Sequence, residues 1–230
     1  MTEPLESSPR VLTGVLVFAS VAVWVSAFLA QLSGALSPGV SGLALTAGVV
    51  AGALGVRPGA GSGTPDESKA GPLARLIAAT KAVTLLEAFA LGLFALVSIR
   101  QFGWLLFERG GLLETLLPNN YGDLPLHWTY VRYLAGGAPF WPENPIISGE
   151  RLRYPFGVDL LTALFVSFGA GMRALLPAMG LVAAGLSAFA LRRWGGALAV
   201  AGFLFSGGLA GFQVLWTGQL VDYQDAAKLL

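Results

Sequence analysis

Long apolar runs separated by short polar segments dominate the chain. A helix needs about 20 apolar residues to cross about 30 Å of hydrocarbon. About six runs approach or reach that length, over residues 11–32, 38–56, 76–98, 156–170, 174–191 and 197–216. The pattern therefore predicts an all-α membrane protein, a polytopic helical bundle of about six spans.

Polar segments divide the chain into three predicted parts. Residues 1–98 hold three spans and a loop rich in Gly, Pro and charge at 57–75. Residues 99–155 lack a 20-residue apolar run and are expected to form a loop of amphipathic helices and proline-rich turns. Residues 156–230 hold about three further spans and a short polar end. The Lys/Arg bias of the short loops favours a cytoplasmic amino terminus, which makes 57–75 cytoplasmic and 99–155 extracytoplasmic.

Composition supports a membrane protein and excludes several classes of function. Hydrophobic residues make up 55% of the chain and charged residues 12%, with a mean hydropathy of +0.69. The 14 Lys+Arg against 13 Asp+Glu leave no basic surplus that would favour nucleic acid. The absence of cysteine excludes disulfides and thiolate chemistry. Glu3 and Glu6 precede the first basic residue, so the first apolar run is interpreted as a retained span rather than a signal peptide.

The polar segment 99–155 contains two stretches that resemble helices. "SIRQFGWLLFERGG" is amphipathic and carries a Trp, which predicts a helix lying at the headgroup level. "DLPLHWTYVRYLAGG" predicts a helix with Asp123 as its N-cap and Gly136-Gly137 as its stop. The apolar positions of this second helix fall on one face, at Leu124, Trp128, Val131 and Leu134.

Asp123 and His127 are the first candidate site residues, because they lie one helical turn apart. The alternative is a purely structural role for both residues: Asp123 caps the helix, and His127 packs at the membrane interface. A divalent metal is compatible with the pair, although two ligands without a third are weak evidence. The sequence alone leaves these alternatives open.

The loop that follows supplies further candidates. Arg151 and Arg153 could bind phosphate or carboxylate through their planar guanidinium groups, or could meet only lipid headgroups. Glu143 and Tyr154 belong to the same loop and join them as candidate substrate-binding residues, together with His127.

Two more acids fall within predicted spans. Glu87 lies inside the third span, where a structural hydrogen bond is the favoured explanation. Asp159 lies one turn inside the next span, close enough to the interface to reach water.

The order of these elements resembles the first part of GT-C-class membrane glycosyltransferases. The resemblance covers Asp123 to Gly208 and rests on "GDLPLH", "VRYLAGG", "FWPENP" and the segment from "RLRYPFGVDLL" to "RRWGG". It implies transfer of a sugar from a polyprenyl-phosphate donor to an extracytoplasmic acceptor, in the bacterial cytoplasmic membrane. It also implies that Asp123 is the general base and that the loop arginines neutralise the leaving phosphate.

This chain departs from the family pattern in three ways. Many members carry two adjacent acids in this loop, whereas Asp123 lies between Gly122 and Leu124. Two extra spans precede the span that leads into the loop, and only about six spans are predicted in total. The chain is therefore expected to be an amino-terminal portion of such an enzyme or to work with a partner chain. The alternative is a non-catalytic polytopic membrane protein, a transporter or an assembly subunit.

Overall fold

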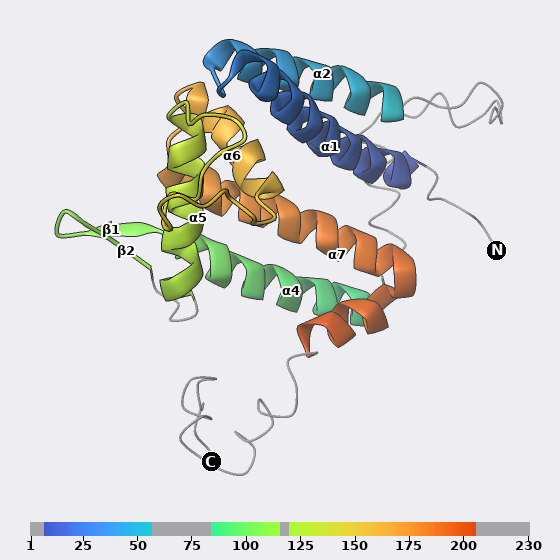
Figure 1. Ribbon diagram of the computed structural model, residues 1–230. Coiled ribbons are helices and arrows are strands. Elements are labelled where there is room, and N and C mark those ends of the chain that lie inside the picture. The colour runs from blue at the N-terminus through green and yellow to red at the C-terminus, as the bar shows by residue number, and fades with distance from the viewer. Residues whose placement is uncertain (1–6, 57–83, 116–119, 206–230) are drawn as a thin grey trace. The chain divides into compact units, whose positions relative to one another are not determined.

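The computed structural model describes residues 7–56, 84–115 and 120–205 of the 230-residue chain. Helices dominate these residues (Figure 1). Within them, four helices are long and apolar enough to cross a membrane: α1 (Ser7–Ser33), α2 (Pro38–Val56), α4 (Leu85–Gly103) and α7 (Met172–Leu204). These four helices support the assignment as a membrane protein.

The expected spans match the helices unequally. The first two agree closely with α1 and α2, and α4, which begins at Leu85, lies within the expected third span, whose first residues, 76–83, lie outside the described part of the chain. Helix α6 (Gly157–Ser167) has only 11 residues, about 16 Å, and is too short to cross a bilayer. The fifth span and the described part of the sixth correspond to the two parts of α7, which are separated by a kink at Gly195 and Gly196, where the backbone is not helical. The prediction of about six spans is therefore not confirmed in the described residues.

The chain divides into two compact units. Within the described residues, the first unit comprises 7–56, 98–115 and 120–184, and the second comprises 84–97 and 185–205.

Glycines bring α1 and α2 together in the first unit. A methyl group added at Gly48 would lie 2.8 Å from the carbonyl oxygen of Phe18, and one added at Gly52 would lie 2.7 Å from that of Gly14. Both distances are too short for a real Cβ atom, so only glycine fits. Small residues four apart are a common contact in membrane helices, and the stretch "GVVAG" uses it here.

Helix α6 forms the centre of the first unit. It packs against α1, α2 and α5 (Asn120–Ala135), and residues 159–164 are all buried. Val131 and Leu134 of α5 contribute fully buried side chains to the same core. The hydroxyl of Ser167 donates a hydrogen bond of 2.7 Å to that of Ser41, which adds a polar link between α6 and α2.

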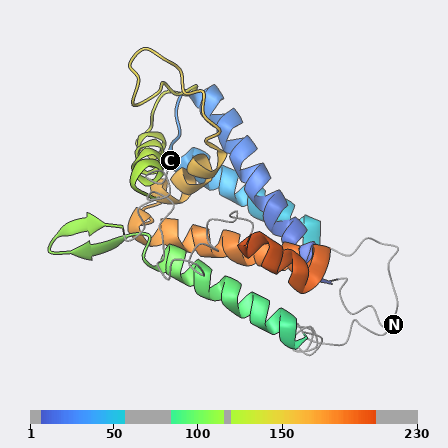
Figure 2. The same cartoon turned by 90° about the horizontal axis from the view of Figure 1, so that it is seen from below.

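A β-hairpin follows α4 where the sequence predicted the continuation of an amphipathic helix. Strand β1 (Phe107–Arg109) pairs antiparallel with β2 (Leu112–Glu114), as Figure 2 shows. The two connecting residues, Gly110 and Gly111, have φ values of +59° and +81°. Positive φ at both positions is what a tight two-residue hairpin turn demands. The helix prediction for this stretch was wrong beyond Gly103, because the two glycines make a turn rather than ending a helix.

Helix α5 ends as predicted but begins earlier. Gly137 adopts a φ of +81°, and the N–H of Gly136 bonds to the carbonyl of Arg132, which terminates the helix. The helix starts at Asn120, so Asp123 lies within its first turn and is not its N-cap. The next segment returns to the α1–α2 connection, where the N–H of Phe140 donates a 2.8 Å hydrogen bond to the carbonyl of Gly34.

The second unit contains the start of α4 and the distal part of α7. Thr84 and Glu87 form a reciprocal capping box: the N–H of Thr84 bonds to Oε2 of Glu87 at 3.0 Å, and the N–H of Glu87 bonds to Oγ1 of Thr84 at 3.2 Å. Oε1 of Glu87 also lies 3.8 Å from Nε of Arg192. The expected structural hydrogen bond of Glu87 is present, but the residue lies at the start of a helix rather than deep inside one.

Candidate functional site

A hydrogen bond between His127 and Asp159 is the centre of the candidate site. Nδ1 of His127, on α5, lies 2.8 Å from Oδ1 of Asp159, on α6. The Asp159 side chain is 5% exposed, whereas that of His127 is 37% exposed. The carboxylate therefore belongs to the interior of the first unit, and the imidazole connects it with the surface.

Two tyrosines complete the surroundings of the pair. The ring of Tyr154 meets that of His127 edge-on, with centroids 5.9 Å apart, and packs against Tyr130 at 5.3 Å. Tyr130 is buried, while Tyr154 is partly exposed. An aromatic wall thus borders the imidazole on the side of the loop that leads into α6.

The environment changes the acidity of two of these groups, which lie outside the four candidate spans. Burial raises the pKa of Asp159, and the hydrogen bond and charge of His127 oppose that rise. Burial also raises the pKa of Tyr130, and the neighbouring Tyr154 and Asp159 add to the increase. The site therefore penalises negative charge, and His127 is the group that offsets this penalty for Asp159.

The geometry suits acid–base chemistry. When Asp159 is ionised, Nδ1 of His127 must carry the proton that the carboxylate accepts. The neutral ring then has its lone pair on Nε2, where it can take a proton from a bound hydroxyl. An acid that fixes the tautomer and orientation of a histidine is the arrangement seen in catalytic triads.

The structure brings together only some of the candidates from the sequence. His127 and Tyr154 are in contact, but Asp123 is exposed and the hydrogen bond of His127 goes to Asp159. Glu143, Arg151 and Arg153 are exposed as well. Glu143 and Arg151 face each other in an isolated antiparallel bridge, so they belong to one folded turn of the loop.

The sequence missed Asp159 and Tyr130 as members of the site. Asp159 was expected to reach water, and this expectation was wrong, because the side chain is buried and bonded to His127. An acid one turn inside an apolar helix was the available signal, since such a residue needs a partner. Among the described residues, no group of three His, Asp or Glu side chains is placed to hold a metal ion.

Comparisons with known proteins identify no family for this chain. No protein-family model, no curated protein and no solved structure matches the chain.

Proposed function

We propose that this chain transfers a sugar from a polyprenyl-phosphate donor to an extracytoplasmic acceptor, as a multi-pass protein of the bacterial cytoplasmic membrane. The resemblance of Asp123 to Gly208 to GT-C-class enzymes motivates the choice of donor. One observation carries the catalytic part of the proposal: the 2.8 Å hydrogen bond that holds His127 on a buried carboxylate.

The proposed reaction uses His127 as general base. Nε2 of His127 accepts the proton of the acceptor hydroxyl while the oxygen of that hydroxyl attacks the anomeric carbon of the sugar. The bond between that carbon and the phosphate oxygen breaks, and the polyprenyl phosphate leaves with the electron pair. Asp159 stabilises the imidazolium that forms, and the imidazolium then returns its proton to solvent.

Burial of Asp159 supports this division of roles. A carboxylate shielded from water interacts strongly with a neighbouring imidazolium, so it can stabilise the charge that develops on His127. Asp123 remains the alternative base that the family resemblance implies, and its exposed position leaves it accessible to a substrate. The two assignments predict different mutant phenotypes.

The test is sugar transfer by the purified protein in lipid nanodiscs supplied with radiolabelled polyprenyl-phosphate sugars. We expect His127→Gln and Asp159→Asn to lower transfer by roughly 10²-fold or more, the usual contribution of a general base. Asp123→Asn is the matched comparison and should retain most of the activity. Loss of transfer in Asp123→Asn alone would reverse the assignment.

A non-catalytic membrane protein is the second candidate. The observation in its favour is that the same hydrogen bond joins two packed helices, and a buried polar pair often serves only to satisfy its own groups. Absence of transfer by the wild type with every donor, together with lowered thermal stability of Asp159→Asn, would support this candidate over the enzyme.

A further inference from the structure

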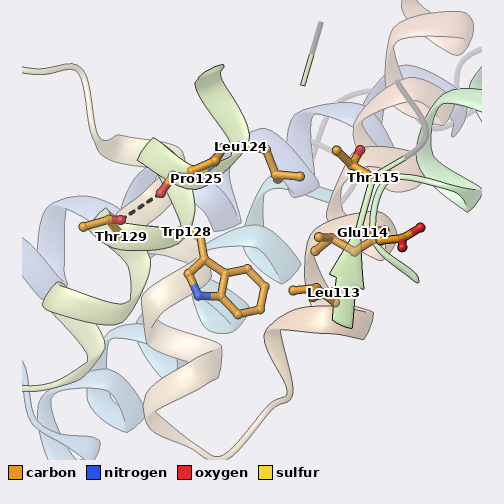
Figure 3. Close-up of a pocket in the computed structure, with 8 residues that line it drawn as sticks. Leu113, Glu114, Thr115, Leu124, Pro125, Trp128 and Thr129 are labelled. Carbon is orange, nitrogen blue, oxygen red and sulfur yellow. Dashed lines mark hydrogen bonds between the residues drawn. The ribbon is translucent and has the colours of Figure 1, made fainter. Parts of the chain in front are cut away.

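A pocket of about 750 Å³ lies between the β-hairpin and α5, in the first unit. It falls within the range of about 300–1,000 Å³ that is typical of small-molecule sites. Most of its lining is apolar, contributed by Leu106, Leu113, Leu124, Pro125 and Trp128. Figure 3 shows the indole of Trp128 directed toward Leu113 of β2.

This pocket is separate from the His127 site. Leu124, Pro125, Trp128 and Thr129 of α5 line the pocket, whereas the ring of His127 is bonded to α6. Helix α5 thus has two faces with different chemistry. Leu124 and Trp128 share the predicted apolar face with Val131 and Leu134, and they are only partly buried because they line the pocket.

Polar groups lie at the pocket wall. The hydroxyl oxygen of Thr115 is buried and has no hydrogen-bond partner among the residues that the structure describes. A buried hydroxyl without a partner is destabilising, and a ligand oxygen could supply that partner. Glu114 also lines the pocket. Its Oε2 lies 3.6 Å from Nε of Arg109, so the charge of the carboxylate is balanced within the hairpin.

The hairpin follows directly after a candidate membrane span. Leu106 comes shortly after Gly103, the last residue of α4, and Trp104 between them is half-exposed, as expected at a headgroup layer. Glu108 of β1 forms an ion pair with Arg173 in the first turn of α7, another candidate span. Ends of two spans therefore hold the hairpin, and the pocket beside it lies within reach of the lipid.

We propose that this pocket binds one acyl chain of a membrane phospholipid, with the ester oxygen of that chain accepting a hydrogen bond from Thr115. The apolar lining matches the hydrocarbon, the unpaired hydroxyl matches an ester carbonyl, and the exposed Arg109 suits the phosphate of the headgroup. This inference is independent of the sugar-transfer proposal.

The test uses photo-crosslinking in nanodiscs made with a phosphatidylethanolamine that carries a diazirine within one acyl chain. We expect adducts to concentrate in peptides containing residues 106–115 and 124–129. Leu113→Trp should lower these adducts roughly tenfold by filling the pocket. Leu112→Trp is the matched control, because neighbouring residues of a strand point to opposite faces, and it should leave the adducts unchanged.

Two further measurements sharpen the outcome. Thr115→Val keeps the shape of the side chain and removes its donor, so it should lower the adducts about two- to tenfold. The proposal would be overturned if the adducts were spread evenly over the exposed faces of the spans. It would also be overturned if the Leu113→Trp variant were labelled like the wild type. Displacement of the probe by a short polyprenyl phosphate but not by excess unlabelled phospholipid would overturn it too. A wild type that labels at the pocket yet transfers no sugar would refute only the proposed enzymatic function.

Discussion

Asp159 and His127 are hydrogen-bonded across two helices although 32 residues separate them in the sequence. The bond closes the loop between α5 and α6 and fixes the exposed edge of the imidazole relative to Tyr154. The carboxyl group of Asp159 is a titratable group in the interior of the first unit, so the stability of this unit should depend on pH.

Stability should depend on pH through Asp159. Burial raises its pKa above the ordinary value of 3.8, so the fold favours the neutral acid. The stability that this preference contributes is fully present below pH 3.8 and is lost as the pH rises through the raised value. In detergent, the melting temperature of the wild type minus that of Asp159→Asn should therefore fall as the pH is raised across this range.

A second variant checks the cause of this pH dependence. In a His127→Leu background both the hydrogen bond and the charge of the histidine are removed, so the pKa of Asp159 should rise further. The decline in relative stability should then extend to higher pH. An unchanged profile in that background would contradict the role given to His127.

The close approach of α1 and α2 should not tolerate a side chain at Gly48. Gly48→Val places its Cβ against a backbone oxygen that cannot rotate away, and overpacking of this kind costs about 1–3 kcal/mol. Gly92→Ala on α4 is the control, because nothing lies within 4 Å of the added methyl group. Thermal unfolding in detergent should show a lower midpoint for the first variant and an equal or higher midpoint for the second.

The bend in α7 should depend on Gly196. This residue has φ +59° and ψ −145°, a conformation that other residues reach only with strain of about 1–3 kcal/mol. We expect Gly196→Ala to straighten the helix or to destabilise the second unit. Gly202→Ala, in the same helix with open space around it and no positive φ, should do neither. The distance between spin labels at positions 187 and 203 would measure the change; the same distance in all three proteins would refute it.

The amino-terminal end of α4 should depend on its capping box. Thr84→Ala removes one of the two reciprocal hydrogen bonds and should cost about 1 kcal/mol. Glu87→Gln keeps an acceptor for the N–H of Thr84 and loses the ion pair with Arg192, whereas Glu87→Ala loses both. Hydrogen exchange at the first turn of α4 should therefore increase more in Glu87→Ala than in Glu87→Gln.

Parts of the fold that depend on local hydrophobicity could be predicted from the sequence. Helices α1 and α2 follow from two long apolar runs with a short connection, and the end of α5 follows from Gly136 and Gly137. The start of α4 at Leu85 has a local signal as well. Thr84 and Glu87 have the spacing of a capping box, but apolar residues on both sides made the stretch look like the interior of a span.

The remaining features depend on tertiary contacts. Gly110 and Gly111 are equally suited to end a helix or to turn a hairpin, and only the pairing of Phe107 with Glu114 distinguishes the two. The spacing of Asp123 and His127 suggested a local pair, yet the partner of His127 is Asp159, from another helix. Sequence periodicity shows which residues share a helix face, but it does not show which element that face meets.

The glycine contact between α1 and α2 also indicates how relatives of this chain could be recognised. A position where even a methyl group collides with a neighbouring main chain accepts no other residue without separating the two helices. Gly48 and Gly52 should thus persist when the lipid-facing side chains around them have been replaced many times over. The spacing of these two glycines, rather than overall identity, should therefore identify distant homologues.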